Sequence, residues 1–195
     1  DTVSDGNCST NCPVLPLFDF AQRKGAFAAI NGPYFCPASY PSCADKQNSF
    51  DTLLMNKNKV YFNSDNNVYS EVPAVIFQGN SARFVTKSQE WGRDTSPDAV
   101  IANRPLLVLN REMVFYGDSE GKHVSRGGRS FIGTTGNTVY IGVVRNATVQ
   151  ESALTLKTLG ITNALNLDDG GSTALWSGKY IVGPGRSLPF GILLL

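Results

Sequence analysis

The chain has 195 residues, of which 42% are hydrophobic and 17% are charged. A chain of this length and composition can bury a core, so we expect one ordered domain over residues 1–195. Its 17 basic and 16 acidic residues give a formal net charge of +1 without a basic block, which argues against nucleic acid as a partner. No apolar run approaches the roughly 20 residues that cross a bilayer, so we predict no membrane span.

The four cysteines fall as two close pairs in the sequence, Cys8 with Cys12 and Cys36 with Cys43. Four cysteines allow three disulfide connectivities, and the spacing does not choose among them. Zinc sites usually contain closer CxxC-like pairs, so zinc fits these spacings poorly. Because the cysteines lie among Asn, Ser and Pro residues, we interpret them as disulfides of an exported protein, whether secreted, periplasmic or at the cell surface.

The first predicted elements are a short helix over residues 15–25 and an apolar strand over 26–30, which stops at an Asn-Gly-Pro turn. A loop rich in Cys, Pro, Ser and Asn follows over 36–50. Short apolar runs, several of them bounded by Asn or Gly, then predict strands. These runs are 58–62, 73–78, 82–86, 99–102, 105–109 and 113–116, and the tail 191–195 predicts a last strand.

The segment 117–130 is polar and rich in glycine, and we expect it to be a loop. A loop of this length between strands is more often functional than accidental. It contains His123, the only histidine, which we predict to line the site, the alternative being a solvent-exposed loop histidine. Strands are predicted after it at 131–135 and 138–144, joined by a Gly-Asn turn.

The clearest helix is predicted over residues 149–159. Thr148 and Glu151 have the spacing of a capping box, and apolar residues recur on one face of the helix. With the strand at 138–144 and a further strand at 162–167, this helix predicts a right-handed βαβ crossover. Many short strands and few helices together predict an α+β domain around a mixed β-sheet.

The end of the strand at 162–167 carries the residues with the most chemistry. Asn166 and Asp168 share one face, because side chains alternate along a strand. Ligands of open sheets bind beyond the carboxyl ends of strands, where Asp168 would lie. The amides of Gly170, Gly171 and Ser172 can form an anion-binding nest beside it. An ordinary strand-to-turn junction has the same composition, so this stretch alone leaves both readings open.

Three stretches occur in a fixed order: AAINGPYF at 28–35, GGRSFIG at 127–133 and TLGITNALNLDDGGSTAL at 158–175. Together they resemble the motifs of the phosphodiester glycosidase family, and the resemblance covers residues 26–195. The last stretch is the most specific of the three. The matching residues are Asn31, Gly32, Phe35, Arg129, Gly133, Asn166, Leu167, Asp168, Gly170, Gly171, Ser172, Thr173, and in a closing turn Arg186 and Pro189.

The resemblance implies hydrolysis of a sugar-phosphodiester or phosphoglycan substrate, with no organic cofactor. Asp168 is then predicted to be the principal catalytic carboxylate, and Glu151, at the position of a family glutamate, its partner. Arginine suits the phosphate because it donates two parallel hydrogen bonds. The predicted substrate-binding residues are Arg129, Asn31, Gly32, Gly170, Gly171, Ser172, Asn166, His123 and Arg186.

Two residues depart from the family pattern. Ser130 replaces the usual threonine and keeps a hydroxyl, whereas Asp169 stands where the family more often has glycine. The added charge either raises the pKa of one of the two carboxyls or faces solvent. The family usually has further strands ahead of its first motif, so the resemblance leaves open whether strands upstream of Asp1 complete the fold.

Two other functions fit the residues. One is a non-catalytic carbohydrate- or cell-wall-binding module. The other is a metal-dependent phosphodiesterase, in which Asp168 and Asp169 hold a divalent cation and the P–O bond breaks. The sequence does not indicate a metal: its single histidine excludes a two-histidine site, and Asp65–Asn67 is too short a signal for calcium. Glu151 is also fully explained as the glutamate of a capping box.

Overall fold

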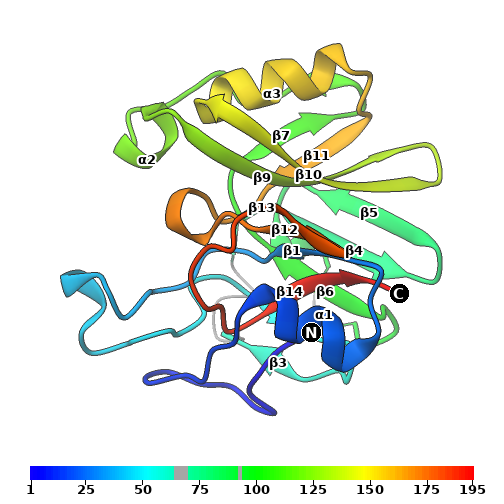
Figure 1. Ribbon diagram of the computed structural model, residues 1–195. Coiled ribbons are helices and arrows are strands. Elements are labelled where there is room, and N and C mark those ends of the chain that lie inside the picture. Colours follow the sequence, from blue (N-terminus) through cyan, green and yellow to red (C-terminus); the bar gives the residue numbers. More distant parts are fainter. Residues whose placement is uncertain (64–69, 92–93) are drawn as a thin grey trace.

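The computed structural model describes residues 1–63, 70–91 and 94–195, so the run 65–67 lies outside the described residues. Figure 1 shows a protein of strands and helices in which the strands outnumber the helices among the described residues. The predicted α+β class is confirmed. The strands lie in three sheets instead of one, and every pairing among the described residues is antiparallel, where a mixed sheet was expected.

The first sheet has the order β13-β12-β1-β14, and helix α1 (Leu17–Lys24) packs on it. Its strands are β1 (Ala28–Asn31), β12 (Leu175–Ser177), β13 (Lys179–Val182) and β14 (Gly191–Leu194). Strands from the two ends of the chain are thus neighbours. The amino and carboxyl ends also lie close together, as Figure 1 shows, and the Asp1 amino group donates to the Gly191 carbonyl at 2.8 Å.

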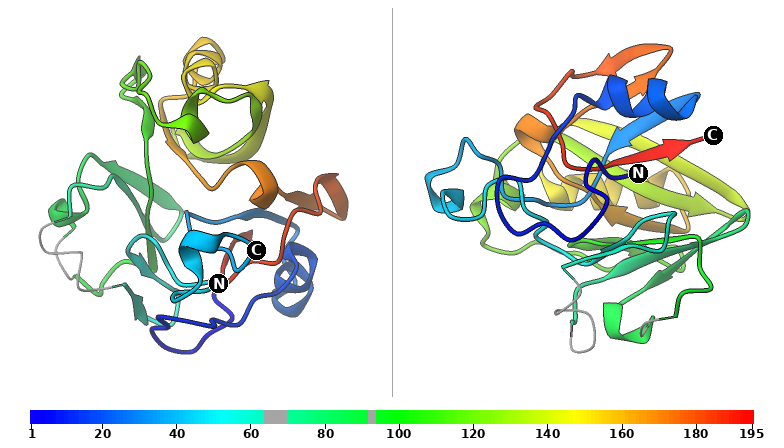
Figure 2. Two further views of the ribbon diagram at one scale, coloured as in Figure 1. Left: turned by 90° about the vertical axis from the view of Figure 1, so that its left-hand side faces the viewer. Right: turned by 90° about the horizontal axis from the view of Figure 1, so that it is seen from below.

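The second sheet, β10-β9-β11-β7-β8, carries helix α3 (Val149–Thr158), and the third has the order β3-β2-β6-β4-β5. The second contains β7 (Leu106–Leu109), β8 (Glu112–Met113), β9 (Gly127–Thr135), β10 (Thr138–Ala147) and β11 (Asn163–Asn166). The third contains β2 (Leu54–Met55), β3 (Tyr61–Phe62), β4 (Ala74–Gln78), β5 (Ser81–Val85) and β6 (Ala99–Ala102). In the left view of Figure 2 the second sheet lies at the top, the third at the left and the first at the lower right.

The predicted strand–helix–strand crossover is present. Strand β9 pairs antiparallel with both β10 and β11, so β10 and β11 run parallel with β9 between them. The apolar face of α3, with Val149, Ala153 and Leu156, packs against β7 and β11. This packing fixes the end of β11, from which the acidic pair of residues 168 and 169 projects.

The glycine-rich segment differs from the prediction of a continuous loop. It contains a short helix, α2 (Gly121–Val124), and β9 begins at Gly127, four residues before the predicted start at 131. The early start follows from β10, which continues to Ala147 and pairs with Gly127 across a bulge. Arg129 is therefore a strand residue that faces Val144, and its backbone is fixed by the sheet.

The largest core cluster lies where the three sheets meet. It includes Phe20 of α1, Ile30 of β1, Ile132 of β9 and Leu165 of β11, all fully buried. Burial of each such side chain contributes about 1.5–3 kcal/mol, so the ends of β1 and β11 are held to the same core. These two strand ends carry the first and last sequence motifs.

The disulfides join neighbouring cysteines, Cys8 with Cys12 and Cys36 with Cys43. This selects one of the three connectivities that the spacing left open. The second disulfide closes the loop that projects beside α2 and the turn after β11, as Figure 2 shows. Within the described residues, no helix is both long and apolar enough to cross a membrane.

Replacing Gly133 by alanine should lower the free energy of unfolding by about 1–3 kcal/mol. A Cβ atom there would lie 2.8 Å from the Asn163 carbonyl oxygen, which belongs to the paired strand and cannot move without disturbing the ladder. Thermal denaturation should show a loss of about 2–4 °C for each kcal/mol. Gly6→Ala, where a Cβ meets no atom within 4 Å, is the control and should leave the transition unchanged.

Candidate active site

A cavity of about 340 Å³ lies beside the end of β11, under the disulfide loop and α2. It collects residues that are far apart in the sequence: the turn after β1, the loop 37–51, α2, the start of β9 and the turn after β11. Its lining consists of Tyr34, Phe35, Pro37, Tyr40, Asp51, Lys122, Ser125, Arg126, Gly127, Arg129, Asp168, Asp169, Gly170 and Ser172. Predicted residues from the second and third motifs thus meet in one hollow.

Asp168 is held by the turn that carries the first motif. Its amide N–H donates to the Gly32 carbonyl at 3.0 Å, and the Asn31 side-chain amide donates to the Asp168 carbonyl at 2.7 Å. The carboxylate accepts the Asp169 amide N–H at 2.9 Å. Burial raises the pKa of the Asp168 carboxyl to about 7, against the opposing effect of the Ser172 hydroxyl and the Asp169 amide that bond it. This carboxyl therefore titrates near neutral pH.

Asp169 points away from solvent and into a buried ion pair. Its carboxylate lies 3.1 Å from Nη1 of Arg129, and the two side chains are 7% and 3% exposed. The same carboxylate accepts the Ser130 amide N–H at 3.2 Å and the Asn166 side-chain amide at 2.9 Å. The alternative that Asp169 faces solvent is therefore wrong.

Arg129 uses all of its nitrogen groups within the protein. Nε donates to the Ala147 carbonyl at 2.8 Å, Nη1 donates to Asp169, and Nη2 donates to the Ser125 carbonyl. The sheet and the ion pair thus fix the guanidinium. It lies at the cavity wall, where its main contact is Asp169.

Asn31 and Gly32 form the floor under Asp168. Asn31 is fully buried, and its side-chain oxygen accepts the Ser130 hydroxyl at 2.8 Å and the Ala174 amide at 3.1 Å. A Cβ on Gly32 would lie 2.2 Å from Cδ2 of Phe190, so only glycine fits there. These two residues hold three segments together and do not line the cavity.

The turn after Asp169 is a single 3-10 turn, Gly170–Ser172. Its own hydrogen bonds use the amides of Ser172 and Thr173, at 3.2 Å and 3.1 Å. Gly170 has a φ of +59°, a conformation that glycine adopts without strain. The amides of Gly170 and Gly171 do not take part in those two bonds.

Three cationic side chains surround the cavity mouth. Lys122 and Arg126 line it, and the Arg186 guanidinium packs on Gly171, where a Cβ would lie 2.4 Å from Nη2. Arg186 also lies 4.9 Å above the ring of Tyr40. Glu120 pairs with Lys122 and Glu151 pairs with Arg126, so the mouth holds charges of both signs, and its three cations are the groups that could bind an anionic ligand.

Glu151 lies outside this lining. Its carboxylate accepts the Thr148 amide at 2.8 Å and completes the capping box of α3, and it pairs with Arg126 on the surface. Hydrogen bonds from the Thr148 backbone hold the pKa of Glu151 below its ordinary value. The structure therefore places Glu151 behind Arg126, and does not bring it to Asp168.

His123 is buried behind the cavity wall, where it contacts Tyr34 and Asp118. The wall residues that were not predicted as site residues are Tyr34, Phe35, Pro37, Tyr40, Asp51, Lys122, Ser125, Arg126 and Gly127. Two of them had a signal in the sequence, because Lys122 and Arg126 flank the single histidine in the polar segment. Tyr34 occupies a variable position of the first motif and gave no such signal.

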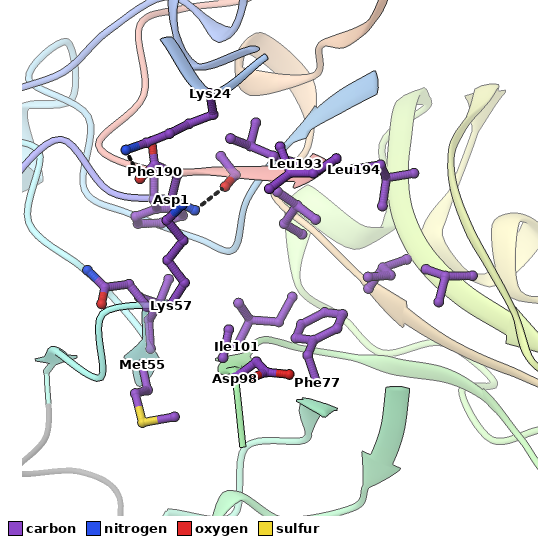
Figure 3. A pocket seen from close by; sticks show the side chains of 18 of the residues that line it. Asp1, Lys24, Met55, Lys57, Phe77, Asp98, Ile101, Phe190, Leu193 and Leu194 are labelled. Atoms are coloured by element: carbon purple, nitrogen blue, oxygen red, sulfur yellow. Dashed lines mark hydrogen bonds and ion pairs between the residues drawn. The ribbon is translucent and has the colours of Figure 1, made fainter. Parts of the chain in front are cut away.

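A second cavity of about 580 Å³ is mainly apolar and lies between β14 and the third sheet. Figure 3 shows Leu193 and Phe77 on its walls, with Lys24 and Lys57 near Asp1 at one end. None of the predicted site residues lines it. The smaller cavity therefore remains the candidate active site.

The sequence model of the phosphodiester glycosidase family matches residues 24–195. The chain belongs to the phosphodiester glycosidase family. The match begins just before β1 and includes every element that contributes to the cavity. A search of curated proteins found no match.

Solved structures share the fold of this phosphodiester glycosidase family member, among them the three that follow. The catalytic domain of zebrafish N-acetylglucosamine-1-phosphodiester α-N-acetylglucosaminidase, auto-inhibited by its pro-peptide, has a TM-score of 0.69 at 16% identity, covering 93% of this chain and 67% of that one. A hypothetical protein from Synechocystis gives 0.59 at 14% identity, with 96% and 54% covered. A putative exported protein from Burkholderia pseudomallei gives 0.55 at 12% identity, with 96% and 69% covered.

Removing the Arg129 guanidinium should destabilise the protein strongly. Arg129→Met leaves the Asp169 carboxylate buried without its cation, which costs about 3–5 kcal/mol. Arg126→Met is the matched control, because its pair with Glu151 is 55% and 42% exposed, and such pairs contribute about 0–1 kcal/mol. Denaturant unfolding measures both changes, and equal losses in the two variants would contradict a special role for the buried pair.

Proposed function

We propose that this family member hydrolyses the glycosidic bond of a sugar-1-phosphodiester and releases a free sugar and a phosphomonoester. The observation that carries the proposal is the Asp168 carboxyl, which lies in the wall of a cavity with three cationic side chains at its mouth. Family membership supports the general reaction, and the name of the zebrafish relative makes N-acetylglucosamine-1-phosphodiesters the first substrates to try.

Asp168 would act on the sugar. Cleavage of a glycosidic bond passes through an oxocarbenium-like state, which an adjacent carboxylate stabilises or traps. Its backbone is fixed on both sides by Asn31 and Gly32, so the carboxylate is held in place before substrate binds. Such preorganisation is what makes electrostatic stabilisation effective in an active site.

The phosphate would lie at the mouth of the cavity. Arg186, Lys122 and Arg126 supply positive charge there, and the amides of Gly170 and Gly171 can donate to an oxygen. We assign Arg129, predicted as a phosphate ligand, to the positioning of Asp169, because each of its three side-chain nitrogens already donates to a protein oxygen. A phosphate leaving group is a stable anion, so strong acid assistance to its departure is not needed.

Glu151 would act indirectly in this scheme. It caps α3 and pairs with Arg126, so it orients one of the cations at the mouth. We also propose that the protein works outside the reducing cytoplasm. Two disulfides support this, because such bonds persist mainly in oxidising compartments.

Hydrolysis of a panel of sugar-1-phosphodiesters in oxygen-18 water tests the reaction. We expect label in the released sugar, because the bond from the anomeric carbon breaks. Label in the phosphate would identify a phosphodiesterase, and chelator-sensitive activity would support its metal-dependent form. Binding without turnover would identify a carbohydrate-binding module.

The Asp168→Asn variant should lose at least about 100-fold in kcat, since a charge-stabilising carboxylate becomes a neutral amide. Steady-state kinetics on the best substrate of the panel measures the loss. Asp98→Asn is the control, because that exposed acid lies in the other cavity, where it accepts the Gly79 amide. A folded Asp168→Asn protein with wild-type turnover would contradict the assignment.

The rate should depend on pH near neutrality. If Asp168 acts as a carboxylate, kcat/KM rises with pH through about 7 and reaches a plateau above it, because burial raises the pKa to that value. A profile that falls through pH 7 would instead require the protonated acid. The profile of wild type, measured between pH 5 and 9 with substrate below KM, distinguishes the two.

A further inference from the structure

Three side chains that the proposed reaction does not yet use form a line of hydrogen bonds into the cavity. The Asp118 carboxylate lies 2.8 Å from Nδ1 of His123, and Nε2 of the same ring lies 3.5 Å from the Tyr34 hydroxyl. His123 is 3% exposed, and the ring of Phe115 packs edge-on against it at 5.6 Å. The Glu120 carboxylate also lies 3.9 Å from Nε2, so the imidazole is held between the Asp118 acid on one side and the Tyr34 phenol and Glu120 on the other.

The partners assign the protons in this line. A carboxylate only accepts, so Nδ1 of His123 carries the hydrogen that points to Asp118, and a neutral ring then has a lone pair on Nε2. The Tyr34 hydroxyl donates to that lone pair. Its oxygen lies 3.2 Å from the Asn166 amide nitrogen, whose two hydrogens are shared among Tyr34, the Leu167 carbonyl at 2.8 Å and the Asp169 carboxylate at 2.9 Å. The line is thus continuous with the acidic pair.

Tyr34 also faces the cavity. It lines the same wall as Asp168, and the Lys122 ammonium lies 4.0 Å from its ring centre. A phenol oxygen accepts up to two hydrogen bonds, and Asn166 uses one, so one lone pair remains for a water or a substrate hydroxyl. Burial and the charges of Asp169 and Asp168 raise the pKa of Tyr34, so the phenol stays protonated at neutral pH.

Glycoside hydrolysis needs a second group that moves a proton. Glu151 does not line the cavity, and the Asp169 carboxylate is bonded to Arg129, Ser130 and Asn166. Among the wall residues, Tyr34 has an oxygen free to accept and a histidine behind it, whereas Asp51 offers the cavity a carboxylate with no histidine bonded to it. An acid–histidine–hydroxyl arrangement of this kind is how proteins activate a hydroxyl group.

We propose that Asp118, His123 and Tyr34 form a proton relay in which Tyr34 is the second acid–base residue of the active site. The proposal rests on the glycosidase function proposed above. Tyr34 is a catalytic residue in this scheme, because it contacts the attacking water. His123 and Asp118 act through it and are positioning residues.

The relay takes one proton from the attacking water and delivers it to the leaving phosphate. The oxygen of water forms a bond to the anomeric carbon while the bond from that carbon to the phosphate oxygen breaks, and its electron pair stays on the phosphate. The water proton passes to the Tyr34 oxygen as the Tyr34 proton passes to Nε2 of His123, and Asp118 stabilises the resulting imidazolium. The proton then returns through Tyr34 to the departing phosphomonoester.

Kinetics of Tyr34→Phe test the catalytic role. We expect kcat to fall by roughly 100- to 10,000-fold with little change in KM, because only the hydroxyl is lost. Asp118→Asn should lower kcat in the same direction by a smaller factor. Tyr180→Phe is the matched control: its hydroxyl accepts the Phe18 amide at 3.0 Å away from the cavity, so its kcat should equal that of wild type.

The single histidine provides a readout that is independent of activity. Labelling with nitrogen-15 histidine gives one pair of ring resonances, and we expect a protonated Nδ1 and an Nε2 that accepts a hydrogen bond. Tyr34→Phe should shift the Nε2 resonance and leave Nδ1 in place, whereas Asp118→Asn should shift Nδ1. If Tyr34→Phe fails to fold, His123→Gln supplies the kinetic test.

The outcomes separate this proposal from the reaction itself. Substrate turnover by wild type with an unchanged kcat in Tyr34→Phe, or in Asp118→Asn, overturns the relay and leaves the glycosidase function standing. If wild type hydrolyses no substrate, that function fails, and a protonated Nε2 would refute the hydrogen-bonding pattern as well. Asp118, Glu120 and His123 offer ligand atoms within 4.8 Å of one another, so a stoichiometric response of both resonances to added zinc would also overturn the relay.

Discussion

The buried ion pair of Arg129 and Asp169 is the interaction on which the site depends. Two charges at 3.1 Å with almost no exposure repay the cost of burial only if further hydrogen bonds satisfy them. Those bonds come from the Ser130 amide and the Asn166 side chain to the acid, and from the arginine to the carbonyls of Ser125 and Ala147. One pair therefore ties β9, β10 and the end of β11 together.

A second set of bonds places the reactive carboxyl beside that pair. Asn31 and Gly32, at the end of β1, bond both sides of the Asp168 peptide and reach Ser130 across the sheets. Because these groups are fixed by the core, Asp168 is held in the wall of the cavity. Burial there raises the pKa of its carboxyl to about 7. The polar groups at the sheet junction thus contribute both to the stability of the fold and to the raised pKa of the Asp168 carboxyl.

Much of this arrangement could be predicted from the sequence. The rest could not, because it depends on contacts between residues that are far apart in the chain. The capping box of α3, the crossover and the strand end at Asp168 depend on local patterns, which the sequence shows directly. The early start of β9 and the partner of Asp169 depend on which strands become neighbours, and local propensity does not encode that. Tyr34 escaped for the same reason, since nothing near it in the chain indicates that a histidine 89 residues away lies against its hydroxyl.

The disulfide of Cys36 and Cys43 has a consequence for how tightly the cavity holds its contents. It closes a short covalent loop, residues 36–43, that contains Tyr40. The guanidinium of Arg186 lies over the aromatic ring of Tyr40. A ring of this size removes most alternative conformations of the loop in the unbound protein. The loop therefore loses little conformational entropy when a ligand binds. Reduction of this disulfide would make the loop flexible again. The affinity for ligand would then depend on the redox conditions around the protein.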